Sequence, residues 1–449
     1  MFIAATFSLL ATTLAPQNPA ASSQDSKPVL ANREQKTLSD KLGKYLAAEI
    51  IYDDSKGKAR EKASKTRRKA KEAFDKEWDK AEKKGILGSM VDLKAVFYNC
   101  FPNKRPEVGK GNFYVRDVDE TDFSYGLQIP KKYSEKTPWT TVVVLPSGKG
   151  GTWTKPKDYF TKVWAGSNLL TSAIVNIPTL PQGLEMDPIP DYSREGAEKE
   201  EDRRIGSVFS SFGFVMNNYN VDRSRVFLDC GKETCGYGLR LASLFPDRWA
   251  GIILRDPTAV DDIRIGNLLN VPILAIDSGD NTATVTALQK RWDEHCPGMM
   301  TVLKGKGAAP HLASAADIEA WMADKQRTMT PKKITLEPNH DRFNKSYWVG
   351  MLVADSLLTA SPDKKPRLQV VADRAANRIT VDAQGVERFE VLLNDDLVDL
   401  SKEFTIVING KAIKETRHRS FREMKKRMML RNDWSYLFPV RYIATVPKE

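Results

Sequence analysis

The sequence predicts an α/β fold in which a mostly parallel sheet is flanked by helices, with a helical arm before it and a small antiparallel β domain after it. From about Asn112, short β-branched and aromatic runs alternate with helical stretches, which is typical of a parallel sheet. Before that point, apolar residues recur at helical spacing from Leu38 onward. Beyond Asp324 the alternation ends, and strand-like runs separated by turn residues follow.

The chain is long enough for two or three domains, because 449 residues with 41% hydrophobic and 28% charged residues can bury a large core. We divide it into a signal peptide at 1–24, a charged helical arm at 25–111, the α/β domain at 112–330 and a β-rich domain at 331–449. The sequence contains neither an internal repeat nor a long low-complexity tract.

The α/β domain is expected to alternate strands with helices. Its strands are placed at 113–115, 124–129, 140–145, 173–177, 225–229, 250–254, 271–276 and 299–303. Its helices are placed at 156–164, 198–218, 236–245, 283–295 and 315–325. An acidic loop at 182–201 is expected to cover the carboxyl edge of the sheet, where open α/β sheets bind ligands.

The β-rich domain is expected to be a small set of antiparallel strands. They are placed at 333–337, 346–353, 368–371, 378–381, 388–393 and 403–409. The turns Asn394-Asp395-Asp396 and Asn409-Gly410 are typical of hairpins. A cationic tract from Arg417 to Arg431 follows the last of these strands.

The first residues predict export to the periplasm or the extracellular space. An apolar run from Phe2 to Leu14 precedes small and polar residues, as in a secretory signal peptide, and it is too short to span a membrane. A disordered apolar terminus is the alternative. No later stretch is long enough to be transmembrane, so we expect no membrane anchor in the mature chain.

The four cysteines, Cys100, Cys230, Cys235 and Cys296, allow three pairings if the protein is exported. Cys230 and Cys235 are close enough in sequence for a local disulfide, and buried free thiols are the other interpretation. The spacing of the cysteines is not that of a zinc site, and the phosphate-loop pattern is absent. We therefore expect no metal and no cofactor.

Positive charge is concentrated in the arm. The net charge is +11, and the stretch Lys56–Lys84 carries 13 Lys or Arg residues against 6 Asp or Glu residues. A surface of this kind prefers anionic partners, and the candidates are a nucleic acid, an anionic envelope polymer or a lipid surface. A solvated helix face without a partner is the alternative.

The stretch Arg225–Asp256 predicts a strand, a sharp turn, a helix and a second strand. Its turn reads Gly231-Lys232-Glu233-Thr234-Cys235, which has the layout of a nucleophile elbow, the G-x-S-x-G turn that lifts a serine above a sheet. Glu233 stands in the place of that serine.

Together with Tyr125–Ser147 and the lead-in Val221–Val226, this turn resembles the α/β-hydrolase superfamily, and most of all its secreted esterases and prolyl-oligopeptidase-like peptidases. The resemblance covers about Ser124–Ala323 and implies an α/β-hydrolase-like sheet. The strands of the last domain resemble the accessory β domain that some exported hydrolases carry.

The resemblance also implies a site, because the family orders its triad as nucleophile, acid and histidine along the chain. The triad positions correspond here to Glu233, to an acid after the strand at 271–276, and to His311. Asp280 is our first choice for the acid and Asp277 the second, while a turn-forming role for Asp280 and a surface-loop role for His311 are the alternatives. The oxyanion-like positions are Ser147, Gly148 and Thr234, although a plain glycine turn fits the loop equally well.

A glutamate cannot follow the serine route, in which a histidine removes the proton of a hydroxyl group. We therefore favour a protein that keeps the hydrolase fold without serine-hydrolase chemistry and acts as a binding or scaffold protein. The alternative is an active esterase or peptidase with a non-standard nucleophile, since some relatives of this fold use an aspartate at the elbow. The ligand expected for either hypothesis is an ester, a peptide or a glycan.

Overall fold

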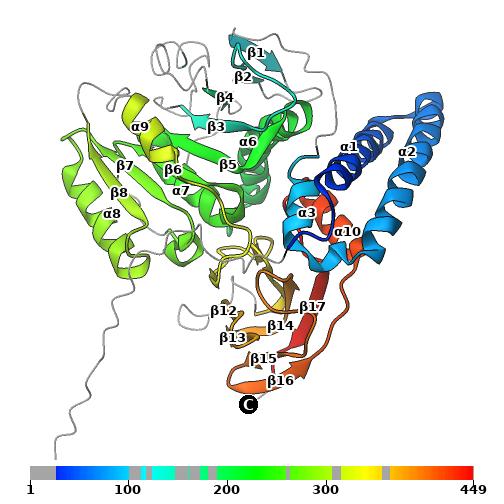
Figure 1. Ribbon diagram of the computed structural model, residues 1–449. Coiled ribbons are helices and arrows are strands. Elements are labelled where there is room, and N and C mark those ends of the chain that lie inside the picture. Colours follow the sequence, from blue (N-terminus) through cyan, green and yellow to red (C-terminus); the bar gives the residue numbers. More distant parts are fainter. Residues whose placement is uncertain are drawn as a thin grey trace, which may run out of the picture.

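The computed structural model describes residues 27–100, 113–117, 124–146, 160, 172–179, 190–258, 263–305, 315–355 and 365–447. Figure 1 shows a large sheet with its helices on one side of the molecule, and the N-terminal helices together with the C-terminal strands on the other. Within the described residues, no helix combines the length and the apolar character needed to cross a bilayer.

In the described part of the chain, the large sheet has eight strands in the order β1-β2-β4-β3-β5-β6-β7-β8. Their bounds are β1 (Phe113–Asp117), β2 (Ser124–Gln128), β3 (Trp139–Leu145), β4 (Ala173–Pro178), β5 (Val221–Cys230), β6 (Gly251–Arg255), β7 (Ile273–Asp277) and β8 (Met300–Lys304). The pairs β1·β2 and β2·β4 are antiparallel, and all pairs from β4 to β8 are parallel. The predicted fold class is therefore confirmed.

Helices cover both faces of this sheet. Those described are α6 (Ala197–Asn218), α7 (Cys235–Leu244), α8 (Thr282–His295) and α9 (Ala315–Met322). One buried cluster joins strand residues to α6, α7 and α8 through side chains such as Val215, Leu239 and Trp292. A second cluster, on the other face, includes Ile318 and Met322 of α9. The helix expected at 156–164, apart from position 160, and the part of the expected loop from 182 to 189 lie outside the described residues; the remainder of that loop leads into α6, which begins at Ala197.

The N-terminal helices pack on the C-terminal part of the chain. They are α1 (Asn32–Asp54), α2 (Gly57–Lys83), the 3-10 helix η1 (Ile86–Gly88) and α3 (Met90–Phe97). Phe74 and Trp78 of α2 share a single buried cluster with the C-terminal strands, and the Trp78 ring stacks on Phe421 with centroids 3.9 Å apart. The two ends of the chain thus share one core, while the large sheet has its own two clusters.

The C-terminal part contains two small sheets. One has the order β10-β11-β14-β17 and the other β16-β15-β13-β12-β9. Their strands are β9 (Lys333–Leu336), β10 (Lys345–Ser346), β11 (Val349–Ala354), β12 (Arg367–Asp373), β13 (Arg378–Gln384), β14 (Val386–Leu393), β15 (Phe404–Ile408), β16 (Lys411–Glu415) and β17 (Val440–Thr445). Helix α10 (Phe421–Arg431) precedes β17 and contains most of the cationic tract.

One of the two predicted hairpins is confirmed and the other is wrong. Asn409 and Gly410 connect β15 to β16 with φ values of 45° and 82°, the left-handed geometry of a tight hairpin. The turn at 394–396 is not a hairpin, because β14 pairs with β11 and β17 whereas β15 pairs with β13 and β16. This turn carries the chain from one sheet to the other. The pairing of β13 with β15 is parallel.

All four cysteine thiols are free and buried, so no disulfide joins Cys230 to Cys235. The Cys230 side chain instead fills the contact between β5 and α7. A Cβ atom added to Gly238 of α7 would lie 2.1 Å from the Cys230 Sγ atom, a distance that real Cβ atoms do not tolerate.

We expect Gly238→Ala to lower the free energy of unfolding by about 1–3 kcal/mol, because the new methyl group overpacks this contact. Adding Cys230→Ala removes the Sγ atom and leaves the Cys230 Cβ 3.3 Å away. The double variant should therefore lose less stability than the sum of the two single variants. Urea unfolding of the four proteins measures this coupling, and strictly additive losses would contradict it.

Candidate functional site

The predicted strand, turn and helix around Glu233 are present. Strand β5 ends at Cys230, the 3-10 helix η4 (Lys232–Thr234) forms the turn, and α7 begins at Cys235. The backbone N–H of Gly231 donates to the Leu145 carbonyl oxygen at 2.9 Å, which ties the turn to β3. Glu233 is exposed at this turn, at the carboxyl edge of the parallel strands.

The turn itself is a relaxed 3-10 helix. A nucleophile elbow is a strained turn, and strain in a non-glycine residue is marked by a positive φ angle. Near this edge of the sheet the positive φ belongs to Asp256, at 54°, directly after β6. The residue with the strained backbone is therefore the buried Asp256, which follows β6, whereas Glu233 follows the neighbouring strand β5.

Asp256 accepts hydrogen bonds from three side chains. Ser278 Oγ lies 2.6 Å from Oδ1, Asn281 Nδ2 lies 2.8 Å from Oδ2, and Lys232 Nζ lies 2.9 Å from Oδ2. Burial alone would raise the pKa of Asp256, but the hydrogen bonds from Ser278 and Lys232 outweigh it and hold the pKa below its ordinary value. Asp256 is therefore a charged anchor that binds the turn to the loop after β7.

Lys232 is affected by the charges of both predicted acidic residues, Glu233 and Asp280. The hydrogen bond to Asp256 is the main cause of its raised pKa, and the charges of Asp280 and Glu233 raise it further. Asp280 is exposed in the loop between β7 and α8. The charges of Glu233 and Asp280 therefore both act on the Lys232 ammonium group, whose direct contact is with Asp256.

Asp277, the second choice for the acid, is buried at the end of β7. It accepts from Lys304 Nζ at 2.5 Å, from Thr282 Oγ1 at 2.9 Å and from the Gly279 N–H at 2.9 Å. The Lys304 hydrogen bond is the largest cause of a pKa below the ordinary value. Both buried carboxylates at this edge, Asp256 and Asp277, are therefore already engaged by a lysine.

Neither neighbour of Glu233 on the α7 side offers a free nucleophile. The Thr234 hydroxyl donates to the Leu145 carbonyl oxygen at 2.9 Å, and its backbone N–H donates to the Gly231 carbonyl oxygen at 2.9 Å. The Cys235 thiol donates to the Gly231 carbonyl oxygen at 3.1 Å, and burial raises its pKa well above the ordinary value. Thr234 is therefore poorly placed as an oxyanion donor, and Cys235 remains a thiol.

Three predicted site residues, His311, Ser147 and Gly148, lie outside the described residues. Sequence reasoning missed the Lys232–Asp256 pair. The sequence did contain a signal for this pair, because Asp256 follows directly after a predicted strand. The carboxyl ends of parallel strands meet at one edge of a sheet, so a residue at that position is expected to lie near the turn that contains Lys232.

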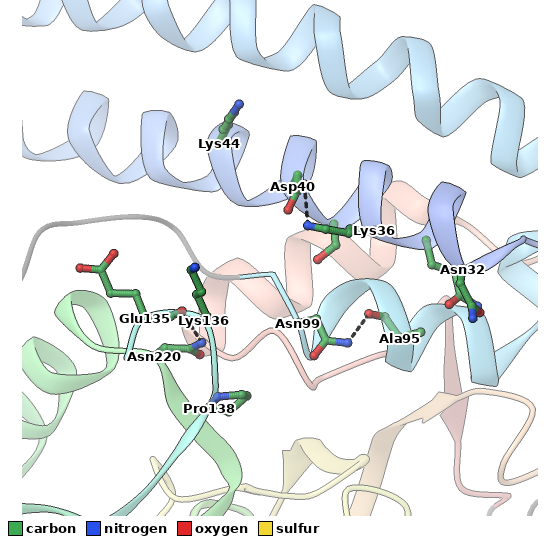
Figure 2. A pocket seen from close by; sticks show the side chains of 12 residues that line it. Asn32, Lys36, Asp40, Lys44, Ala95, Asn99, Glu135, Lys136, Pro138 and Asn220 are labelled. Atoms are coloured by element: carbon green, nitrogen blue, oxygen red, sulfur yellow. Dashed lines mark hydrogen bonds and ion pairs between the residues drawn. The ribbon is translucent and has the colours of Figure 1, made fainter. Parts of the chain in front are cut away.

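A second feature is a polar cleft of about 830 Å³ between α1 and α3 on one side and the large-sheet unit on the other. Figure 2 shows Asp40 on α1 and Lys136 rising toward that helix from the opposite wall. The cleft is lined by Asn32, Gln35, Lys36, Ser39, Asp40, Lys44, Ala95, Asn99, Glu135, Lys136, Pro138 and Asn220. Amide, ammonium and carboxylate groups make it suited to a polar ligand.

No protein-family model matches this sequence, and no curated protein does. Similar solved structures include a thermostable esterase, with 16% identity, a TM-score of 0.38, and coverage of 48% of this chain and 63% of that chain. A predicted CIB-like hydrolase from Thermoplasma acidophilum has 13% identity, a TM-score of 0.33 and coverage of 47% of this chain and 96% of that chain. Esterase 2 of Thermogutta terrifontis, phosphonylated by cyclosarin, has 11% identity, a TM-score of 0.34 and coverage of 50% and 96%.

This chain thus spans less than two thirds of the thermostable esterase. The strand order, the parallel centre of the sheet and the helices on both of its faces are the α/β-hydrolase-like fold that the sequence resemblance implied.

Proposed function

We propose that this protein is an exported binding or scaffold protein that keeps an α/β-hydrolase-like fold but lacks standard serine-hydrolase activity. The observation that carries the proposal is the acidic side chain of Glu233 at the turn between β5 and α7. A carboxylate has no hydroxyl proton for a histidine to remove, so the serine acyl-enzyme route has no starting point at this position.

The surroundings of Glu233 support the same proposal. Thr234 and Cys235 donate to backbone carbonyl groups, so neither side chain supplies a substitute nucleophile. Asp256 and Asp277 are engaged by Lys232 and Lys304, so neither carboxylate is free to orient an imidazole. A working triad needs a base that a third group orients; among the described residues the two buried candidates for that group are occupied, and Asp280, the first choice for the acid, is exposed to solvent.

The alternative is an active esterase or peptidase in which Glu233 attacks the substrate. The exposure of its carboxylate at the carboxyl edge of the sheet favours this alternative. Attack of the carboxylate on the acyl carbon of an ester or peptide would form a mixed anhydride with Glu233 and release the alcohol or amine, which takes up a proton, and water would then hydrolyse that anhydride. Glu233→Gln removes the nucleophile without changing its size, so it should abolish any turnover of this kind.

The ligand that we propose is a polar ester, peptide or glycan, and the cleft between α1 and the large-sheet unit supports this choice. Its walls carry amide groups, as on Asn99 and Asn220, beside charged groups such as Asp40 and Lys136. Such groups exchange hydrogen bonds with hydroxyl and amide groups of a ligand.

We expect the purified protein to remain unlabelled by a serine-reactive fluorophosphonate probe and to hydrolyse generic acyl esters no faster than buffer. Glu233→Ser should also remain unlabelled, because Asp256 and Asp277 stay engaged by their lysines. A serine esterase of known activity serves as the positive control. Turnover that disappears in Glu233→Gln would contradict the binding role and support the alternative, whereas labelling of Glu233→Ser would contradict the proposed engagement of the acids.

A further inference from the structure

Helices α1 and α2 form a hairpin that is anchored at one end only. Figure 1 shows the hairpin projecting away from the remainder of the molecule, with the connection between its two helices at the far end. The large side chains that α2 buries, Phe74 and Trp78, belong to its C-terminal half, while its N-terminal half buries only Ala63. The N-terminal half of α2 is therefore a surface held at a distance from the body.

This projecting half carries the net positive charge of the arm. Residues 56–71 contain nine Lys or Arg residues and one acidic residue, Glu61. Four exposed lysines follow the spacing i, i+4, i+7 and i+11, which places them in one stripe along the helix, with neighbours about 5–6 Å apart. We call this stripe the lysine row, and its members are Lys58, Lys62, Lys65 and Lys69.

The lysine row is not used by the fold. None of its four ammonium groups forms an ion pair with any described residue, whereas nearby Arg67 pairs with Glu49 and Lys71 with Asp75. The first turn of α2 contains no acidic residue. Cations near the N-terminus of a helix oppose its dipole, so this distribution of charge does not stabilise α2.

The second cationic tract of the chain behaves differently. In and beside α10, Arg419 pairs with Asp395, Arg427 with Glu390 and Arg431 with Asp247. These arginines hold the C-terminal part together. Among the described residues, Arg422 and Lys426 of this tract are exposed and form no ion pair, but its other five Lys and Arg residues are engaged, whereas the lysine row leaves all four of its charges available to a partner.

The other side chains of the projecting half decide the class of partner. Its exposed residues include no bulky apolar side chain from 56 to 71, so it has nothing to insert into a bilayer. It also lacks an aromatic ring on which a nucleic-acid base could stack, and nearby Tyr52 is covered by Arg60 and Arg67. We infer that the lysine row binds an anionic polysaccharide, whose linear array of charges matches a linear row of ammonium groups. This inference deepens the proposed binding role, on which it rests, by naming the class of partner.

The test uses the full chain and fluorescein-labelled heparin as the anionic polysaccharide, with binding followed by fluorescence anisotropy at several salt concentrations. Replacing the four lysines of the row with glutamine should weaken binding at least about tenfold at low salt. It should also reduce the slope of log Kd against log salt by roughly 3, since each neutralised charge contributes about 0.7 for a single-stranded polyanion. Glutamine preserves helix propensity, so circular dichroism should be unchanged.

The matched control changes four exposed lysines elsewhere to glutamine, with an equal change in net charge. They are Lys131, Lys132, Lys290 and Lys332. Equal weakening in the two variants would overturn the inference, because net charge alone would then explain binding. Binding more than tenfold tighter to a single-stranded oligonucleotide, or to vesicles containing anionic lipid, would overturn the choice of partner. None of these measurements depends on hydrolysis. The inference about the lysine row can therefore fail while the proposal about Glu233 stands, and the proposal about Glu233 can fail while the lysine row still binds.

Discussion

Replacing Arg255 with methionine is expected to lower the free energy of unfolding by about 3–5 kcal/mol, because it leaves the Asp229 carboxylate buried without a counter-charge. Arg255 ends β6, and its Nε and Nη2 atoms donate to the two Asp229 carboxylate oxygens at 2.7 and 2.9 Å. The two side chains are 4% and 0% exposed. An unpaired carboxylate at this depth has no access to water, so the native state bears the full desolvation penalty.

The double variant Arg255→Met with Asp229→Leu provides the control. It removes both charges and fills their space with apolar atoms, and such replacements of a buried pair are often neutral or stabilising. Urea unfolding should therefore show a large loss for the single variant and recovery of most of that loss in the double variant. Equal losses in both would mean that the shape of the guanidinium group, and not its charge, is what the sheet requires.

This pair matters to the candidate site because of its position. Asp229 lies two residues before Gly231, and β5 and β6 carry Glu233 and Asp256 just beyond the pair. Any shift between the two strands would move these carboxylates relative to Lys232. The buried pair thus supports the geometry on which the proposed function depends.

The sequence could predict the large sheet because its strands are short, apolar and bounded by turn residues. β3 is the clearest case, since five of its seven residues are buried and they form one continuous β-branched and leucine run. Strands buried on both faces produce such runs. The strand that precedes Glu233 was predictable for the same reason, and so was the start of α7 after a turn with a glycine.

The shared core of the two chain ends could not be predicted. The stacking of Trp78 on Phe421 joins segments far apart in sequence, and helical periodicity shows only that a face is apolar, not what covers it. The error at 394–396 has a related cause. Asn-rich and Asp-rich turns indicate that the chain reverses, but not whether the next strand returns to the same sheet.

The candidate site was predictable only in part. Glu233 and Asp280 were found because each follows a strand in an order that resembles a known family. Asp256 and Lys232 were missed because a pair formed between two loops has no fixed spacing in the sequence. The buried partners of a candidate residue are set by the packing of neighbouring strands, and a sequence pattern records only the strands.

Asp433→Asn is expected to cost about 3–5 kcal/mol, because the Asp433 carboxylate is a buried counter-charge for arginines from the large-sheet unit. Arg327 donates to its two oxygens at 2.8 and 3.2 Å, and Arg248 lies 3.7 Å away. The control is Asp382→Asn, which removes an exposed carboxylate 3.6 Å from Arg367 and should change stability by less than about 0.5 kcal/mol. A small effect at Asp433 would mean that Asp247 alone balances these arginines.

The same pair predicts how acid affects stability. Burial alone would raise the pKa of Asp433, but the guanidinium of Arg327 outweighs it and holds the pKa well below the ordinary value of 3.8. Because the folded pKa lies below the unfolded one, this carboxylate stabilises the fold fully above the unfolded value, and the contribution is lost as the pH falls through the range beneath it. The difference in unfolding free energy between wild type and Asp433→Asn should therefore be constant from about pH 5 to 8 and shrink below about pH 4. Urea unfolding across this range measures it, and a difference that grows as the pH falls would mean that the pKa is shifted in the opposite direction.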